Sequence, residues 1–182
     1  HGFFVADVDN KPNDPLQALQ DQSAMLRPFR GEDPQLRSGL VLAGANQPEA
    51  DPNDDGYLTA AEAASLQLDG TELVVLSACS TGQGDIRTGE GVYGLQRSLT
   101  VAGARSTLLS LWKVDDAATA EFMSRFYKRL KAGEGRSDAL AATQKEFREG
   151  QVKDPKTGLA WDTPYYWAAW QLVGDWRPIK GL

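Results

Sequence analysis

One cysteine and one histidine are the residues of this chain best suited to nucleophilic chemistry. Cys79 is the only cysteine and His1 the only histidine in 182 residues. A thiol is largely protonated at neutral pH, so a nucleophilic cysteine needs a nearby base or cationic group. Position alone leaves Cys79 open to two interpretations, a nucleophile or an inert thiol of the core. The upstream histidine favours the nucleophile, because cysteine proteases pair a cysteine with such a histidine.

Cys79 follows a segment that predicts a buried strand. Leu73–Leu76 is a short, continuous apolar run, which is typical of a strand covered on both faces, as in a parallel sheet. The carboxyl end of a parallel strand is where α/β folds place their chemistry. The residues around the thiol leave room for a substrate because they are small or turn-forming, namely Ser77, Ala78, Ser80 and Gly82.

The length, composition and net charge of the chain limit the classes of protein to which it can belong. A chain of 182 residues with 41% hydrophobic and 24% charged residues is ordinary for one globular domain. A net charge of −6 without a long basic cluster argues against nucleic acid and anionic membranes as partners. No apolar run approaches the ~20 residues of a membrane span. A single cysteine fits a reducing compartment, so we expect a cytoplasmic protein.

The rest of the chain alternates predicted strands and helices. We expect strands at Leu36–Ala43, Leu73–Ala78, Thr107–Trp112 and Tyr165–Val173, and helices at Thr59–Leu66, Val92–Ala102, Asp115 or Asp116 to Ala132, and Asp138–Arg148. This order predicts an α/β fold with a mostly parallel sheet and helices on both faces. With about four strands visible, we expect further strands before His1. The Gly-rich loop Gln83–Gly91 is expected to become ordered on activation.

Eight segments resemble the CHAT domain family. They are L-V-V-L-S-A-C-S-T-G (Leu73–Gly82), G-E-G-V-Y-G-L (Gly89–Leu95), A-G-A-R-S (Ala102–Ser106), L-W-K-V-D-D-A-A-T-A (Leu111–Ala120), F-Y-K-R-L (Phe126–Leu130), P-Y-Y-W-A-A-W (Pro164–Trp170), L-R-S-G-L-V-L-A-G-A-N (Leu36–Asn46) and D-G-Y-L-T-A-A-E (Asp55–Glu62). The resemblance runs from His1 to about Pro178. It implies that residues 1–182 are the C-terminal part of a CHAT peptidase domain, with a caspase–hemoglobinase-like fold whose N-terminal strands are missing from this chain.

The resemblance implies a cysteine endopeptidase, since CHAT domains are relatives of caspases, metacaspases and separase. The family's catalytic histidine lies in a His-Gly pair, matched by His1-Gly2, and its nucleophile lies in S-A-C-x-T-G, matched by Cys79. The N–H groups of Gly2 and Cys79 are then candidates for an oxyanion hole. The family suggests regulated proteolysis in defence or cell death. The alternative is a catalytically silent CHAT scaffold that binds a partner.

Residues after the predicted strand Thr107–Trp112 are candidates for substrate specificity. Relatives of this clan use an acidic residue in this region to receive a basic side chain, and a similar stretch of separase matches Asp116. Asp115 or Asp116 also suits the N-cap of the following helix, and two adjacent aspartates allow both roles. Trp112 is a candidate for the substrate groove or for ordinary packing.

The segment Asp51–Glu62 matches the template of a calcium-binding loop. Asp51, Asn53, Asp55 and Glu62 would supply side-chain oxygens, and Tyr57 a backbone carbonyl. The competing interpretation is a turn at Asp55-Gly56 followed by a capping box between Thr59 and Glu62. Calcium is therefore one candidate ligand, and the proposed chemistry requires no cofactor. A copper site built on a terminal histidine is excluded, because it needs a second histidine.

The expected partners are proteins. A peptidase implies a protein substrate, and the resemblance implies an upstream domain of the same polypeptide, because CHAT domains are often fused to TPR repeats. Caspase relatives also mature by cleavage into pieces that stay associated. We therefore expect an N-terminal fragment or a TPR-like upstream domain to accompany this chain.

Overall fold

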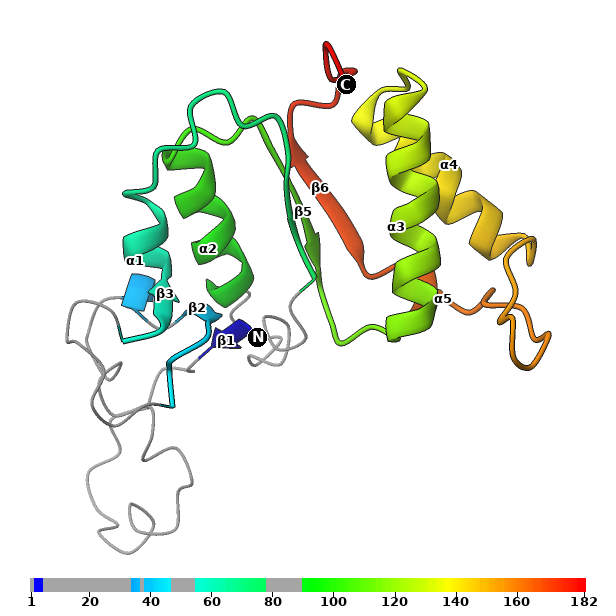
Figure 1. Cartoon of the computed structure of the whole chain (residues 1–182), viewed down its shortest axis with the longest axis horizontal. Coiled ribbons are helices and arrows are strands. Elements are labelled where there is room, and N and C mark those ends of the chain that lie inside the picture. The colour runs from blue at the N-terminus through cyan, green and yellow to red at the C-terminus, as the bar shows by residue number, and fades with distance from the viewer. Residues whose placement is uncertain (1, 5–33, 37, 47–54, 78–89) are drawn as a thin grey trace, which may run out of the picture.

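The computed structural model of the chain describes residues 2–4, 34–36, 38–46, 55–77 and 90–182 (Figure 1). These residues form a mixed α/β structure. The strands are β1 (Gly2–Phe4), β2 (Ser38–Val41), β3 (Tyr57–Thr59), β4 (Val74–Leu76), β5 (Ser106–Ser110) and β6 (Trp170–Gly174). The helices are the 3-10 turn η3 (Pro34–Leu36), α1 (Ala60–Ala63), α2 (Glu90–Val101), α3 (Asp116–Lys131), α4 (Arg136–Arg148) and α5 (Pro164–Trp167). No helix of the described ranges has both the length and the apolar character needed to cross a bilayer.

The strands pair in two small sheets. One has the order β1-β2-β3 with antiparallel pairs, and the other has the order β4-β5-β6. Among the described strands only β4 and β5 pair in parallel, so the mostly parallel sheet expected from the sequence is not confirmed. The reason lies at Leu111, whose N–H donates to the carbonyl of Ala169 over 2.8 Å. The chain thus re-enters the sheet at the carboxyl end of β5, and β6 must run back along it.

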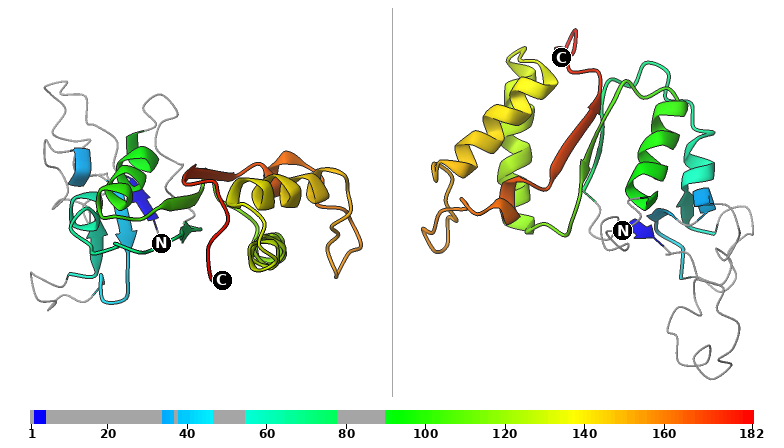
Figure 2. Two further views of the ribbon diagram at one scale, coloured as in Figure 1. Left: turned by 90° about the horizontal axis from the view of Figure 1, so that it is seen from above. Right: turned by 180° about the vertical axis from the view of Figure 1, so that it is seen from behind.

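Helices cover both faces of the β4-β5-β6 sheet, as the sequence predicted. Along β4, Val74 and Leu76 pack against the cluster formed with α1 and α2. Leu73 and Val75 pack against the cluster formed with α3 and α4. Alternate side chains of a strand point to opposite faces. The two helix pairs therefore lie on opposite sides of the strand, which agrees with their separation in Figures 1 and 2.

The larger core cluster is centred on α3. Ala118, Phe122, Phe126 and Leu130 recur every four residues and are all buried, as an amphipathic helix requires. The ring of Phe122 lies 5.3 Å from that of Phe147 in α4 and 5.5 Å from that of Trp170 in β6. Truncating a buried phenylalanine to alanine typically costs about 3–5 kcal/mol. This cluster therefore fixes α3 and α4 on their face of the sheet.

The predicted strand Tyr165–Val173 is wrong in its first half. Pro164–Trp167 form α5, and β6 begins at Trp170. Pro164 occupies the first helical position, where its fixed φ and missing N–H suit a helix start. The aromatic residues of this segment are typical of a strand, which explains the prediction. Pro164, which follows the N-cap residue Thr163, instead starts a helix.

The first sheet differs from the prediction in its short strands. The strand expected at Leu36–Ala43 is confined to β2, because Leu36 belongs to η3. The strand β3 was not predicted, and the helix expected at Thr59–Leu66 is confined to α1. Strands of three residues are too short to show a period of two, and β3 exists because it pairs with β2 through register contacts such as Gly39 with Thr59.

The start of α4 also differs from the prediction. The helix begins at Arg136 with Gly135 as N-cap, instead of at Asp138 with Ser137 as cap. Gly135 offers no side-chain cap, and the N–H of Ser137 instead donates to the carbonyl of Trp176 over 3.4 Å. A cap supplied from the far end of the chain leaves no local signal in the sequence.

Candidate functional site

The carboxyl ends of β4 and β5 lie at one edge of the sheet. The strands are parallel, with Leu76 opposite Leu109. Ser77 follows β4 and is exposed. This is the edge at which α/β folds place catalytic groups. Cys79 lies two positions beyond Ser77 and outside the described residues, so its predicted role as nucleophile stays a prediction.

Gly2 is buried in β1, where it pairs with Leu40 of β2. In the views of Figures 1 and 2, β1 lies at the same end of the molecule as the carboxyl end of β4. The next residue, Phe3, is buried with its ring 5.9 Å from that of Tyr57, which holds β1 in place. His1 lies outside the described residues, so the structure places its neighbour Gly2 but not the imidazole.

The two candidate aspartates differ sharply in their surroundings. Asp115 is the N-cap of α3, and its Oδ1 accepts a hydrogen bond from the N–H of Ala118 over 2.9 Å. Asp116 is the first residue of the helix and is exposed. Within the described ranges no hydrogen bond or ion pair engages the Asp116 carboxylate. The capping role predicted for one of the pair is therefore filled by Asp115, and Asp116 keeps a carboxylate available to a ligand.

Trp112 is half-buried at the carboxyl end of β5. Its Nε1–H donates to the carbonyl of Tyr165 in α5 over 3.2 Å, and its ring packs against the α3–α4 cluster. The contact fixes α5 beside the sheet edge, so the packing role is shown. The partly exposed ring also leaves surface for a substrate, and that role stays a prediction.

The candidate calcium loop is described only in its second half. Asp55 accepts a hydrogen bond from the N–H of Tyr57 over 2.9 Å. Glu62 accepts hydrogen bonds from both the N–H and the hydroxyl of Thr59, and this capping box was predicted. Gly56 has a φ of 76°, which suits either a turn or the loop's sixth position.

Two of the proposed calcium ligands, Asp51 and Asn53, lie outside the described residues. Within the described part of the chain no group of three or more His, Cys, Asp or Glu side chains is arranged to hold a metal ion. One carboxylate oxygen of Glu62 is already used by the capping box. Calcium binding therefore requires this carboxylate to share or release its contact with Thr59.

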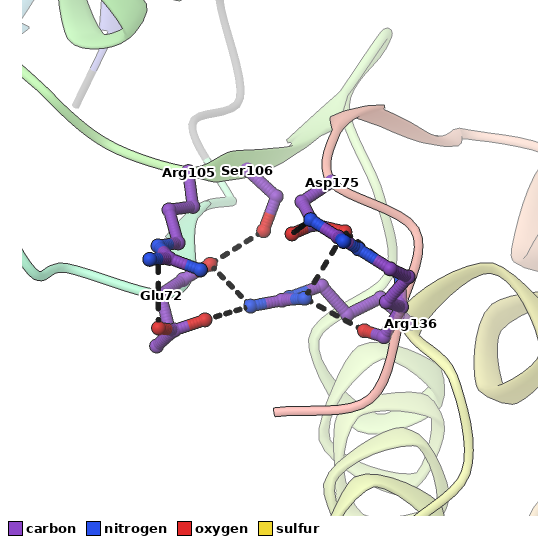
Figure 3. Close-up of polar contacts among 6 residues, drawn as sticks. Glu72, Arg105, Ser106, Arg136 and Asp175 are labelled. Atoms are coloured by element: carbon purple, nitrogen blue, oxygen red, sulfur yellow. Dashed lines mark hydrogen bonds and ion pairs between the residues drawn. The ribbon is translucent and has the colours of Figure 1, made fainter. Parts of the chain in front are cut away.

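Sequence reasoning missed a polar cluster at the amino end of β4. It joins Glu72, Arg105, Ser106, Arg136, Asp175 and Arg177, which come from four separate parts of the chain (Figure 3). The side chain of Arg136 is completely buried. The sequence signal was Glu72, a charged residue directly before the apolar run Leu73–Leu76. A single charged residue does not reveal that its partner is the distant Arg136.

The fold and the described part of the site define an α/β protein with a candidate catalytic edge where two parallel strands end. The family model of the CHAT domain matches residues 1–175, and the chain belongs to this family. The family is related to caspase-like cysteine peptidases, which implies a caspase-like fold.

The chain is also similar to two much longer curated proteins. It is 33% identical over 132 residues to tetratricopeptide repeat protein 28 of Homo sapiens, covering 72% of this chain and 5% of that protein. It is 33% identical over 118 residues to tetratricopeptide repeat protein 28 of Mus musculus, covering 65% of this chain and 4% of that protein. These matches confirm the predicted association of this type of domain with TPR proteins, and they span only a small fraction of the relatives' length.

Proposed function

We propose that the chain provides the catalytic part of a cysteine endopeptidase. The observation that carries the proposal is that β4 and β5 end together at one edge of the sheet, where Ser77, the first residue of S-A-C-S-T-G in the sequence, directly follows β4. Membership of a family related to caspase-like peptidases supports the same chemistry. Gly2, on β1 at this end of the molecule, supports a contribution from the His1-Gly2 pair.

In the proposed mechanism His1 takes the proton of the Cys79 thiol. The thiolate attacks the carbonyl carbon of the scissile peptide bond, and the carbonyl oxygen becomes an oxyanion. The N–H groups of Gly2 and Cys79 would stabilise that charge, each by about 3–4 kcal/mol in comparable sites. The C–N bond breaks as His1 returns the proton to the leaving amine. Water then attacks the thioester and releases the acid and the free thiol.

Asp116 is the proposed receptor for a basic side chain before the cleaved bond. Its exposed carboxylate starts α3, and α3 follows β5 from the same edge of the sheet at which β4 ends. The neighbouring carboxylate of Asp115 is engaged as the helix cap. A charged hydrogen bond to arginine or lysine contributes about 1.5–3 kcal/mol. Trp112 would line the same surface through the exposed part of its ring.

The proposed domain is completed by an upstream segment of the same polypeptide. The edge of β4 that faces away from β5 has no strand partner within the described ranges. Leu73–Leu76 carry no charge and are all only half-buried, unlike the fully buried residues of β5. An apolar strand with an open edge is prone to pair with another strand. A strand from the upstream segment would cover it.

The second candidate function is a silent CHAT scaffold that binds a partner protein. The observation that favours it is the name of the two relatives, which describes repeats and no peptidase. The two candidates differ in one property, the reactivity of Cys79 toward a peptide-like acylating group.

The test uses a thiol-directed, acyl-mimicking peptide probe with arginine or lysine at the cleavage position. It is applied to the chain expressed with its upstream segment, and to Cys79→Ala and His1→Ala variants. Labelling that needs both residues supports the peptidase, and a probe with a neutral residue at the cleavage position is the control for Asp116. Labelling by neutral probes alone keeps the peptidase and removes the basic specificity. Absence of labelling by every probe in a folded protein contradicts the proposal and favours the scaffold.

A further inference from the structure

The apolar pattern of β4 does not specify how this strand is aligned with β5. Every residue of Leu73–Leu76 is apolar, and alternate residues enter the two core clusters. A slip of one residue would exchange the faces of the strand, and three of its four positions would still receive an apolar side chain. Because both faces of the strand are apolar, the apolar pattern by itself does not distinguish the observed register from one shifted by a residue. The strand ladder has only three register pairs, Val74–Leu76 against Thr107–Leu109.

A slip of β4 would displace the segment that carries Cys79. One residue of strand corresponds to about 3.3 Å, and a shift by one also reverses the side to which each side chain points. In one direction the slip would draw the charged Glu72 into the half-buried, apolar place of Leu73. In the other direction the small, uncharged Ser77 would enter the half-buried place of Leu76, so no charge would oppose the slip. Contacts outside the apolar run must oppose this second slip.

Glu72 supplies those contacts. Its backbone carbonyl accepts hydrogen bonds from the Ser106 hydroxyl over 2.6 Å and from Arg136 Nη2 over 3.1 Å. Its carboxylate pairs with the same Nη2 of Arg136 and lies 3.4 Å from Nε of Arg105. Glu72, two residues before β4, is thus bound through both its backbone and its side chain, as Figure 3 shows.

The arginine is itself held from the far end of the chain. Arg136 Nη1 donates to the carbonyl of Arg177 over 2.6 Å and lies 3.8 Å from the Asp175 carboxylate. The chain reaches this point because Gly174 has a φ of 100° and comes so close to Arg105 that a side chain would collide with its carbonyl oxygen. The N–H of Asp175 then donates to that oxygen over 2.9 Å. The guanidinium therefore joins the segment after β6 to the segment before β4.

We propose that Arg136 and Ser106, acting through Glu72, set the register of β4 against β5. They are positioning residues, since they lie at the end of β4 opposite the candidate catalytic edge. This role holds whether or not Cys79 is a nucleophile, because it concerns the strand and not the chemistry at its end.

The test compares Arg136→Lys, Glu72→Gln and Ser106→Ala with Arg129→Lys as a matched control. Arg129 also forms a fork of ion pairs, to Glu134 and Glu146, but on α3. Lysine keeps the charge at position 136 and loses the fork that reaches Arg177 and Glu72 together. Ser106→Ala removes one hydrogen bond and keeps the buried charges paired, so it provides a readout where the arginine variant does not fold.

Two measurements report on register in the chain expressed with its upstream segment. The first is hydrogen exchange of the β4 amides, which we expect to be about tenfold faster in the cluster variants, relative to the α3 amides. The second is the rate of alkylation of Cys79 by iodoacetamide as a function of pH. The single cysteine makes this signal specific, and we expect its pH profile to shift in the cluster variants and not in Arg129→Lys.

The outcomes separate register from general stability and from the proposed peptidase activity. Lower melting temperatures with unchanged β4 exchange and unchanged alkylation profiles would overturn the register proposal. Shifts that appear equally in Arg129→Lys would also overturn it. Iodoacetamide needs only an accessible thiol, so faster exchange and shifted alkylation in a protein that no peptide probe labels would support the register proposal and count against the peptidase alone.

Discussion

At the scale of single residues, two adjacent aspartates are distinguished by one hydrogen bond. Asp115 is bound to the N–H of Ala118, and Asp116 is exposed. We predict that Asp116→Asn lowers kcat/KM for substrates with a basic residue before the cleaved bond by about 10–100-fold, which corresponds to one charged hydrogen bond. Its melting temperature should change little, because the carboxylate is exposed and no hydrogen bond or ion pair joins it to the described residues.

The control for this prediction is Asp115→Ala. Loss of the N-cap should lower the free energy of unfolding by about 1 kcal/mol, with equal effects on basic and neutral substrates. Steady-state kinetics with matched arginine and norleucine peptides, together with thermal unfolding, would check both variants. Equal losses on the two peptides in Asp116→Asn would contradict a specificity role.

Glu62 allows the capping box and the calcium loop to be distinguished by a single substitution. A glutamine at this position can still accept hydrogen bonds from Thr59, because capping boxes accept Glu or Gln. It cannot supply the bidentate carboxylate that closes a calcium loop. We predict that Glu62→Gln changes unfolding by less than about 0.5 kcal/mol in chelator. If calcium binds, this variant should abolish the heat of calcium binding that calorimetry detects in the wild type.

The comparison for the capping box is Thr59→Ala, which should cost about 1 kcal/mol with or without calcium. A wild-type protein that releases no heat with calcium, and that unfolds at the same temperature in calcium and in chelator, would exclude the metal. In that case the segment Asp55–Glu62 is a turn followed by a helix start.

At the scale of elements, α3 and α4 are joined by a carboxylate that bridges two arginines. Arg125 Nη1 donates to Glu146 over 2.7 Å, and Arg129 Nη2 binds its other oxygen. Partial burial alone would raise the pKa of Glu146, but the hydrogen bonds from the two arginines hold this pKa below its ordinary value. The bridge therefore stabilises the fold at neutral pH.

The sign of this effect gives a pH prediction. A depressed pKa means that the stabilisation is complete above the unfolded-state value of about 4.3 and is lost as the pH falls through the lower folded-state value. Glu146→Gln should cost about 1 kcal/mol at pH 7. The difference from wild type should begin to shrink as the pH falls below the unfolded-state pKa of about 4.3, and it should close as the pH passes below the lower folded-state pKa. Unfolding followed across pH would check this. Glu149→Gln, at an exposed carboxylate 3.8 Å from Lys145, should show almost no difference at any pH.

The sequence predicted the elements whose signals are local. The helix predicted from Asp115 or Asp116 to Ala132 matches α3, the run Leu73–Leu76 identified β4, and Thr59 with Glu62 identified the capping box. It failed where a distant segment decides the local structure. The antiparallel direction of β6 depends on the contact of Leu111 with Ala169, and the start of α4 depends on the carbonyl of Trp176.

In the candidate site, too, the residues with local sequence signals were predicted and those that depend on distant contacts were not. Cys79 and His1 are recognised by residue type and motif, and these signals need no coordinates. Which of Asp115 and Asp116 caps the helix could be decided only from the structure, where the N–H of Ala118 donates to Asp115. The cluster around Arg136 could not be predicted, because its members are dispersed between positions 72 and 177 and become neighbours only in the folded chain.

At the scale of the whole molecule, the described strands leave one apolar edge open. β4 has β5 on one side and no partner on the other within the described ranges, and its residues are half-buried. Such an edge favours association with other strands unless a segment covers it. The chain spans only 5% and 4% of the lengths of its two relatives. The upstream segment proposed above would cover this edge.

We predict that adding the upstream segment, fused or coexpressed, protects the β4 amides from hydrogen exchange and raises the melting temperature of residues 1–182.

The matched control is Val75→Lys, at a β4 residue that faces the α3–α4 cluster. This variant should lose the protection together with the sheet. Equal protection and equal melting temperature with and without the segment would contradict the prediction, because an edge strand that gains a partner must lose exposed N–H groups. Retained association without protection of β4 would place the contact between the two parts on a surface other than the edge of β4.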